Sequence, residues 1–221
     1  MKGYMAIKRG KFIVFEGSGG SGKGTQIKKA KKLLLANGLK VVTTREPGGV
    51  PVSEEMRSFI FALKERKLIG SEGQMVLFFA ARKFWIDKFV KPNIDNGTSV
   101  LSDRCYMATA AYQGYGEGGS QSQILGIADV AVGRYKPDAV ILLDISPEAS
   151  MKRRENPDGD PYDKESVEFF ERVIAGYRKM AKTNWGRLNW YMVDGEPEPE
   201  VVAEAVVQVL ENIFSRKLNR V

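Results

Sequence analysis

Apolar and polar positions follow two alternating patterns along the chain. Short apolar runs typical of buried strands occur at residues 11–16, 40–44, 98–103, 139–144 and 189–194, and longer stretches with helical periodicity separate them. Buried strands joined by helices form parallel sheets with helices on both faces and right-handed crossovers. The pattern therefore predicts an α/β fold with a five-stranded parallel sheet, and such sheets bind ligands at the carboxyl ends of their strands.

Length and composition are those of one globular domain. The chain has 221 residues, 43% of them hydrophobic and 28% charged, with no internal repeat or low-complexity linker. We expect a single domain over residues 1–221. Its apolar runs are too short for a membrane span of about 20 residues, and its start does not read as a signal peptide, so we expect a cytoplasmic protein with no membrane partner.

The cysteine and histidine content limits the kinds of catalytic and metal site that the chain can form. Cys105 is the one cysteine and there is no histidine, which excludes an internal disulfide, multi-cysteine zinc sites and histidine-based triads. Chemistry must therefore use carboxylates, lysine, arginine, backbone amides or a bound metal. The net charge of +7 either steers anionic partners or reflects basic residues on surface helices.

A glycine-rich loop, "GSGGSGKG" at residues 17–24, follows the first predicted strand and precedes a helical run. Its spacing matches G-x-x-x-x-G-K, in which backbone amides and a helix amino terminus hold phosphate and the lysine reaches the β and γ phosphates. The flanking strand and helix argue against a merely flexible surface loop. We predict that ATP is bound by Gly17, Ser18, Gly19, Gly20, Ser21, Gly22, Lys23, Gly24 and Thr25.

The residue after the lysine departs from the usual motif. Gly24 stands where a serine or threonine normally ligates magnesium, and Thr25 follows it. Either Mg²⁺ bound with ATP keeps a water in that place, or Thr25 compensates. The stretch "GKGTQ" resembles the loop of adenylate kinases, which indicates a nucleoside monophosphate kinase.

A second group of motifs lies beyond the second predicted strand. Arg45 and Glu46 precede a turn that contains Pro47, which is a rigid way to aim a guanidinium and a carboxylate into the crevice. The stretches "TREPGG", "LFFAAR" and "DRCYMATAAYQG", in this order after the glycine loop, resemble thymidylate kinases, which phosphorylate dTMP from ATP. The resemblance runs from about residue 11 to the final helix. It implies a P-loop NTPase fold of three αβα layers with a short lid at about residues 150–163.

The resemblance implies an acceptor site for dTMP. Phe78 and Arg82 are four residues apart and share a helix face, where the ring would stack on a pyrimidine and the guanidinium would donate to its O4. Alternatively, Phe78 is an ordinary core residue. Arg104 would hold the acceptor phosphate, with Arg45 sharing that role. The predicted substrate-binding set is completed by Glu16, Thr109, Tyr112 and Gln113. Two alternatives stay open: each of the three helix residues could equally serve only to pack the helix, and Glu16 could serve only as the ion-pair partner of a neighbouring arginine.

The basic cluster formed by Lys152, Arg153 and Arg154 precedes the turn-rich stretch "ENPDGDPYD". Thymidylate kinases carry a catalytic arginine in the glycine loop or in the lid, and this glycine loop contains none. The resemblance thus implies a lid arginine, with Arg153 first and Arg154 second, beside Lys23 and Arg104 as catalytic residues. Outside this context such a cluster is usually a solvated face. Asp103 and Asp163 are the predicted metal ligands, acting directly or through water.

Four positions depart from the family pattern. Gly19 replaces an aspartate that contacts the metal and the sugar, and Cys105 replaces a ring that helps exclude a 2′ hydroxyl. Ala108 replaces a frequent serine, and Ala128 falls where an asparagine or glutamine often approaches the base. Each change removes polar recognition. From Gly19 and Cys105 we expect dUMP and ribonucleotides to compete better than is usual for the family.

Other functions remain open at this point. One is a kinase of another pyrimidine nucleoside monophosphate such as dUMP, and another is a P-loop nucleotide-binding switch or a nucleic-acid-binding protein. The lid and the stacking pair argue against a switch, and the chain has no concentrated basic and aromatic tract, so we expect no nucleic-acid partner. Thymidylate kinases are commonly homodimers, so the resemblance implies a homodimer, and the apolar stretch "GQMVLFFAARKFWIDKFV" is rich enough in large residues to cover a two-fold interface as well as a core.

Overall fold

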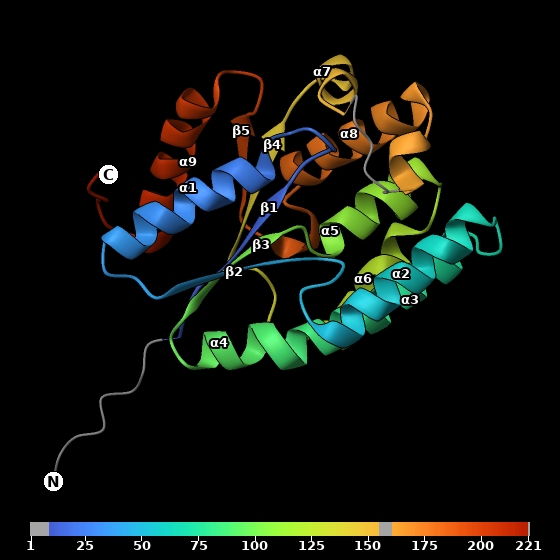
Figure 1. Ribbon diagram of the computed structural model, residues 1–221, viewed down its shortest axis with the longest axis horizontal. Coiled ribbons are helices and arrows are strands. Elements are labelled where there is room, and N and C mark those ends of the chain that lie inside the picture. The colour runs from blue at the N-terminus through green and yellow to red at the C-terminus, as the bar shows by residue number, and fades with distance from the viewer. Residues whose placement is uncertain (1–8, 155–160, 221) are drawn as a thin grey trace, which may run out of the picture.

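The computed structural model describes residues 9–154 and 161–220, and five parallel strands lie at its centre (Figure 1). Each strand lies within one residue of its predicted range, so the predicted α/β fold with a parallel sheet is confirmed. The spatial order is β2-β3-β1-β4-β5, which puts β1 in the middle. The strands are β1 Phe12–Glu16, β2 Val41–Arg45, β3 Ser99–Asp103, β4 Ala139–Asp144 and β5 Trp190–Asp194.

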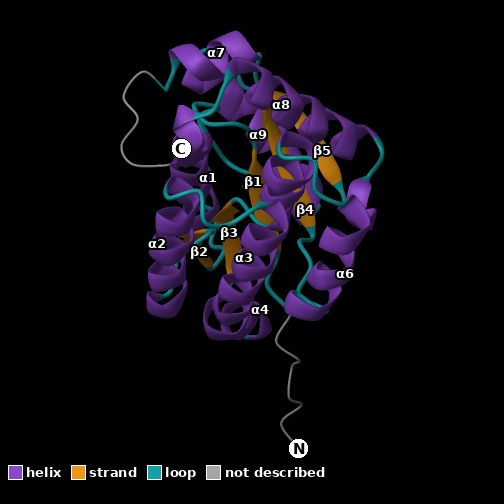
Figure 2. Cartoon of the chain, turned by 90° about the vertical axis from the view of Figure 1, so that its right-hand side faces the viewer, coloured by secondary structure: helices purple, strands orange, loops and turns teal. Residues whose placement is uncertain are grey.

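Helices cover both faces of the sheet, as Figure 2 shows. They are α1 Lys23–Ala36, α2 Pro51–Glu65, α3 Ser71–Trp85, α4 Lys91–Asp95, α5 Tyr106–Thr109, α6 Gln121–Ala131, α7 Pro147–Lys152, α8 Val167–Lys182 and α9 Pro199–Phe214. Two π-helical segments, η1 Ile86–Val90 and η2 Ala110–Gly116, continue α3 and α5, and two 3₁₀ turns are η3 Pro161–Lys164 and η4 Trp185–Arg187.

The alternation of side chains along β1 explains the two cores. Phe12 and Val14 belong to a core that includes residues of α3, α6 and α8, whereas Ile13 and Phe15 belong to a core with α1 and α9. All four side chains are completely buried. Because successive residues of a strand point to opposite faces, a continuous apolar run is needed when both faces are covered.

The register brings the ends of β1, β2 and β3 together. Asp103 at the end of β3 is paired with Phe15 of β1 and with Arg45 of β2. The segments that follow these strands therefore start from one edge of the sheet. In the part of the chain described here, the longest apolar helical stretches fall short of what a bilayer crossing requires.

The start of α1 differs from the starts of α6, α7 and α8. Ser120, Ser146 and Ser166 accept hydrogen bonds from backbone amides at the starts of α6, α7 and α8. At α1 the capping position is Gly22, with φ of 88° and no side chain to accept such a bond. The first amides of α1 are thus left for another acceptor, as expected at an anion-binding helix terminus.

Candidate functional site

The glycine loop joins β1 to α1 through backbone conformations that favour glycine. Gly17, Gly20 and Gly22 have φ values of 142°, 76° and 88°. A Cβ on Gly17 would also lie 2.6 Å from the carbonyl oxygen of Leu143. The sequence therefore requires glycine here for conformation and for close packing on β4.

Lys23 lies over this loop. Its side chain is buried, and its Nζ donates to the carbonyl oxygens of Gly17 at 3.2 Å and Ser18 at 3.0 Å, and to the Ser21 hydroxyl at 3.3 Å. The ammonium group is thus held within the concave backbone that precedes it. An anion entering the loop would meet this charge together with the first amides of α1.

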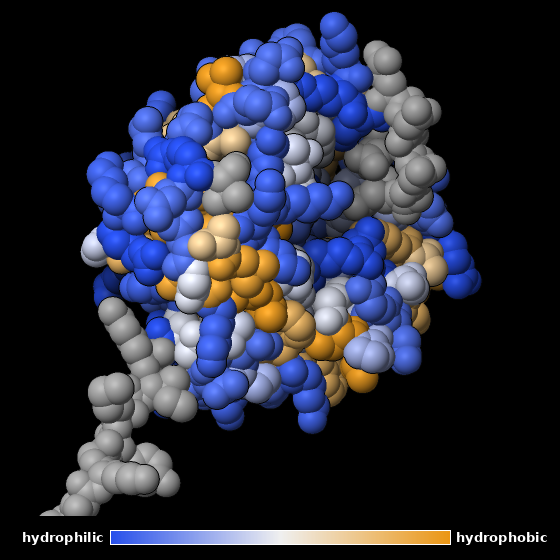
Figure 3. All heavy atoms as spheres, turned by 60° about the vertical axis from the view of Figure 1, so that its left-hand side comes forward, coloured by the Kyte–Doolittle hydropathy of each residue, from blue (hydrophilic) through white to orange (hydrophobic). Residues whose placement is uncertain are grey.

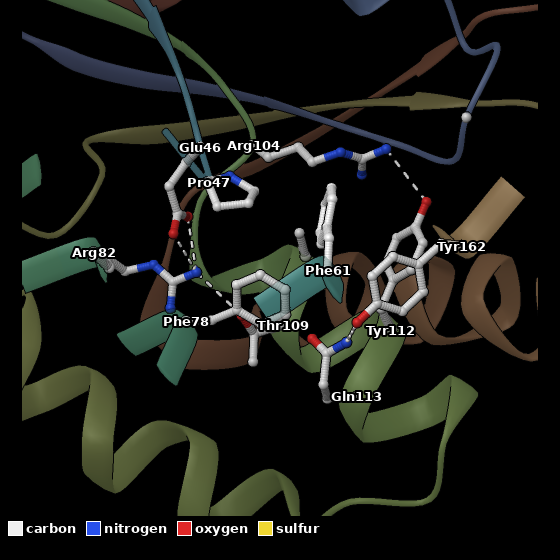
Figure 4. A pocket seen from close by; sticks show the side chains of 12 residues that line it. Glu46, Pro47, Phe61, Phe78, Arg82, Arg104, Thr109, Tyr112, Gln113 and Tyr162 are labelled. Atoms are coloured by element: carbon white, nitrogen blue, oxygen red, sulfur yellow. Dashed lines mark hydrogen bonds and ion pairs between the residues drawn. The ribbon is translucent and has the colours of Figure 1, made fainter. Parts of the chain in front are cut away.

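Two hollows flank the loop. The inner pocket is shown in Figure 4, and the outer groove lies between the loop, the end of α7 and the start of α9. The inner pocket is lined by Gly19, Glu46, Pro47, Phe61, Phe78, Arg82, Arg104, Ala108, Thr109, Tyr112, Gln113 and Tyr162. The outer groove is lined by Gly20, Ser21, Gly22, Thr25, Gln26, Arg153, Gly195, Glu196, Pro197, Glu198, Pro199 and Val202.

A buried ion pair forms one wall of the inner pocket. Nη2 of Arg82 lies 2.7 and 2.8 Å from the two carboxylate oxygens of Glu46 and donates to the Thr109 hydroxyl at 3.1 Å. Both charged side chains are only 2% exposed. Burial raises the pKa of Glu46, and the neighbouring guanidinium opposes that shift. Nε and Nη1 of Arg82 have no hydrogen-bond partner among the described residues.

Arg104, directly after β3, connects the inner pocket to the glycine loop. Its Nη1 donates to the Gly17 carbonyl at 2.8 Å and to the Tyr177 hydroxyl at 3.1 Å, and its Nη2 donates to the Tyr112 hydroxyl at 3.3 Å. Its backbone has a φ of 73°, which is uncommon for a residue other than glycine. The surrounding oxygens keep the pKa of Arg104 well above its ordinary value despite burial.

Glu16 lies behind Arg104 and does not line the inner pocket. It accepts hydrogen bonds from the Cys105 amide at 2.8 Å and from the Tyr177 hydroxyl at 2.7 Å. Burial raises its pKa to about 7, while Arg104 and the two hydrogen bonds act in the opposite direction. In this arrangement Glu16 orders the segment around Arg104.

Arg153 and Arg154 follow α7 and point in different directions. Arg153 donates to the carbonyl oxygens of Gly195 at 2.9 Å and Glu196 at 2.7 Å, and so lines the outer groove. Arg154 donates from Nε to the Ser150 carbonyl at 3.1 Å, and its guanidinium lies 3.5 Å from the centre of the Phe170 ring. Its side chain also lies against Gly19.

Several predicted residues lie elsewhere. Arg45 pairs with Glu54 at 2.8 Å with 53% of its side chain exposed, and it is not among the residues that line the inner pocket. Cys105 and Ala128 are buried in the core and are likewise absent from the pocket lining, whereas Ala108 and Gly19 belong to it. The expected effect of Cys105 on the sugar thus has no direct contact to support it.

The predicted metal ligands are Asp103 and Asp163. Oδ1 of Asp103 is buried and has no hydrogen-bond partner within the described chain. The side chain of Asp163, like residues 155–160 of the predicted lid, lies outside the described residues. Among the residues that the structure does describe, no three or more histidine, cysteine, aspartate or glutamate side chains come together as a metal site.

Sequence reasoning missed Pro47, Phe61 and Tyr162 as lining residues. Tyr162 packs edge-on against Tyr112 and accepts a hydrogen bond from Gln113 at 2.6 Å. The available signal in the sequence was an aromatic residue within a turn-rich stretch, because a tyrosine that is buried there needs a hydrogen-bond partner for its hydroxyl. Its partners are far away in the sequence, and nothing in the local pattern identifies them.

Comparison with known proteins gives a consistent result. The sequence model of the family described as thymidylate kinase matches residues 15–206. A thymidylate kinase of Prosthecochloris aestuarii is 36% identical and aligns over 93% of this chain and 94% of its own length. Another, from Hahella chejuensis, is 38% identical and aligns over 92% of this chain and 97% of its own length. With the glycine loop and the two hollows on either side of it, these matches lead to one conclusion: the chain belongs to the thymidylate kinase family.

Proposed function

We propose that this protein transfers a phosphoryl group from ATP to dTMP and so forms dTDP and ADP. The observation that carries the proposal is the position of the glycine loop between two hollows, since Gly19 lines the inner pocket and Gly20, Ser21 and Gly22 line the outer groove. A loop in this position brings two bound phosphates together. Membership of the thymidylate kinase family supports the same reaction.

The acceptor would occupy the inner pocket. The Phe78 ring offers a stacking surface for a pyrimidine, and the two N–H groups of Arg82 without a partner in the described chain can donate to a base carbonyl. Arg104 lies between this pocket and Gly17, where it can hold the acceptor phosphate by charge-assisted hydrogen bonds. Thr109 supports Arg82, while Tyr112 and Tyr162 border the rest of the pocket.

ATP would lie in the outer groove with its phosphates in the glycine loop. Lys23 and the first amides of α1 would hold the β and γ phosphates. Oδ1 of Asp103, which has no hydrogen-bond partner within the described chain, and the hydroxyl of Thr25, which lines the outer groove, are the groups that would hold a magnesium ion bound with its own water. When bound, this ion would neutralise phosphate charge.

The two arginines after α7 would have different roles, one toward the donor nucleotide and one toward the transferring phosphoryl group. Arg153 lines the outer groove and suits a contact with the donor nucleotide. Arg154 lies against Gly19, at the wall of the inner pocket, and suits the transferring phosphoryl group. This reverses the order in which the sequence ranked them. Transfer then needs only positioning and charge neutralisation by Lys23, Arg104 and Arg154.

A homodimer is the assembly that we favour. Large apolar side chains are exposed on α2 and α3, including Phe59 at 56%, Val76 at 53% and Phe84 at 44%. Figure 3 shows one face of the molecule, mostly hydrophilic, with hydrophobic surface gathered across its lower half. Two-fold pairing through α2 and α3 would cover the exposed apolar side chains. Light scattering during gel filtration should give twice the chain mass, and Phe59→Glu should give the monomer.

An acceptor panel tests the reaction. The protein, ATP and Mg²⁺ are mixed with dTMP, dUMP, dCMP, UMP, AMP or thymidine, and ADP release is followed in a coupled assay. We expect fast turnover with dTMP and slower turnover with dUMP. Slow ADP release that does not depend on the acceptor would favour a nucleotide-binding switch and contradict the proposal.

A further inference from the structure

The guanidinium of Arg104 meets three oxygens from separate parts of the chain. Its Nη1 donates to the Gly17 carbonyl at 2.8 Å and to the Tyr177 hydroxyl at 3.1 Å. Its Nη2 donates to the Tyr112 hydroxyl at 3.3 Å, and Figure 4 shows this bond. These bonds use both N–H groups of Nη1 and one of Nη2. Within the described chain, the other N–H groups of Arg104 remain for an anion in the inner pocket that it lines.

The Tyr177 hydroxyl can take part in these bonds in only one way. A guanidinium has donors and no acceptor, so the hydroxyl oxygen must accept from Arg104. The hydroxyl proton is then left for a different partner, and Tyr177 donates it to Oε2 of Glu16 at 2.7 Å. Oε1 of Glu16 accepts from the Cys105 amide at 2.8 Å. Arg104, Tyr177 and Glu16 thus form one chain of hydrogen bonds with a defined direction.

Tyr177 lies on a part of the fold that is held in place. Its side chain is 1% exposed and belongs to α8. The next residue, Arg178, donates from Nε to both carboxylate oxygens of Asp144 at 2.9 Å, which ties α8 to the end of β4. A buried hydroxyl on an anchored helix has one position, and its hydrogen bonds impose that position on Arg104.

The same hydroxyl lies between two groups of opposite charge. Burial raises the pKa of Glu16, and Arg104 is the cation that opposes this rise most strongly. The two side chains nevertheless form no ion pair with each other in the described chain, and each bonds to the Tyr177 hydroxyl instead. Without that hydroxyl, Oε2 of Glu16 would lose its donor, and the guanidinium would be drawn toward it and away from the inner pocket.

We propose that Tyr177 is a positioning residue for the acceptor phosphate, because its hydroxyl keeps Arg104 apart from Glu16 and directs the remaining N–H groups of the guanidinium into the inner pocket. This inference rests on the proposed function and deepens it, since Tyr177 is not among the residues that line the pocket. A donor that is already in place costs less to order when the phosphate binds. Only ligands that carry a phosphate gain from this arrangement.

The test compares the binding of dTMP and thymidine, which differ by the phosphate. In Tyr177→Phe we expect Kd for dTMP, measured by calorimetry, to rise about tenfold, the usual effect of one hydrogen bond to a charged group. Kd for thymidine should stay unchanged, because thymidine makes no bond to Arg104. Thermal unfolding checks the fold of the variant. Equal weakening of both ligands, or unchanged binding of dTMP by the folded variant, would overturn the inference.

Tyr115→Phe is the matched control. The Tyr115 ring lies against Gly176, the residue before Tyr177 on α8, and its hydroxyl makes no hydrogen bond within the described chain. The same atom is thus removed beside the same helix, and Kd for both ligands should be unchanged. A loss of dTMP affinity as large as that in Tyr177→Phe would contradict the proposed role of Tyr177.

A second comparison holds even where Tyr177→Phe alone does not fold. In the Arg104→Met background, Tyr177→Phe should leave Kd for dTMP unchanged, because no guanidinium remains to be positioned. A further loss of affinity in that background would overturn the inference. Failure of the proposed function has a different signature, since the unmodified protein would then release no ADP in response to dTMP. A protein that phosphorylates dTMP, and whose Tyr177→Phe variant binds dTMP normally, keeps its function and loses only this role of Tyr177.

Discussion

The side chain of Arg154 occupies the space beside Gly19 that any side chain at that position would need. A Cβ on Gly19 would collide with Cδ of Arg154, and Ser150 from the same segment donates to the Gly19 carbonyl at 2.8 Å. The glycine that replaces the family aspartate therefore lets the end of α7 pack directly on the loop. The chain thus lacks the carboxylate of the family aspartate at this position, and the side chain of Arg154 lies against the loop instead.

A double-mutant cycle tests the dependence of Arg154 on Gly19. Gly19→Ala should displace Arg154 and lower kcat about tenfold, and Arg154→Ala should lower it by at least as much. In the Arg154→Ala background, Gly19→Ala should have little further effect because nothing remains to be displaced. Additive losses in steady-state kinetics would show that the two residues act independently.

Replacement of Lys23 tests the glycine loop. Lys23→Met removes the charge held over the loop and should lower kcat about 100-fold or more with the fold intact. Lys29→Met on the same helix is the control, since the Lys29 side chain is only partly buried and, among the described residues, pairs with Glu200 at 2.8 Å. Circular dichroism and coupled kinetics check both variants. Normal turnover by Lys23→Met would refute the assignment.

The buried pair of Arg82 and Glu46 gives a prediction on stability. Glu46→Ala leaves a guanidinium buried without its partner and should lower the free energy of unfolding by about 3–5 kcal/mol. Arg45→Met breaks an exposed pair with Glu54 and should cost less than about 1 kcal/mol. Urea denaturation measures both. Equal losses in the two variants would contradict this reasoning, and Glu46→Leu combined with Arg82→Met should recover stability relative to Glu46→Ala.

Glu16 predicts how stability depends on pH. Its pKa in the folded protein is about 7, above the ordinary value of 4.5, so between these values the unfolded chain loses a proton that the folded protein keeps. The contribution of the neutral carboxyl is complete below pH 4.5 and is lost as the pH rises through 7. The Glu16→Gln variant has no titrating carboxyl at this position and does not lose stability in this way. The free energy of unfolding of the variant, relative to that of the unmodified protein, should therefore increase from pH 5 to pH 8 by up to about 3 kcal/mol. Parallel profiles in chemical denaturation would contradict the prediction.

The sequence was sufficient for the sheet and for part of the site. Both faces of the sheet are covered, so β1 and β4 are continuous apolar runs that are easy to recognise. Phe78 and Arg82 were expected in the site from the resemblance to thymidylate kinases, and their spacing of four residues on one helix agrees with the fact that both line the inner pocket. Arg45 and Glu46 were both expected to point into the crevice, but neighbouring residues of an extended chain point to opposite sides, and only Glu46 lines the pocket.

The features of the candidate site that could not be predicted from the sequence depend on contacts between residues far apart in the chain. Gln74, Gln113 and Tyr162 come from three separate elements, and their hydrogen bonds depend on how those elements pack. Arg153 and Arg154 are neighbours in a basic cluster, yet adjacent positions at the end of a helix point about 100° apart. Their separate surroundings, the outer groove for one and Gly19 for the other, follow from tertiary structure.

The central position of β1 in the sheet affects how precisely the phosphate-binding groups are spaced. The glycine loop follows β1, Arg104 follows the neighbouring β3, and α7 follows the neighbouring β4. Hydrogen-bonded strands lie about 4.7–4.9 Å apart, and this interval varies little among proteins. The groups around the phosphates are thus spaced by backbone dimensions common to all sheets, so mutations that alter the outer helices should leave the distance between donor and acceptor almost unchanged.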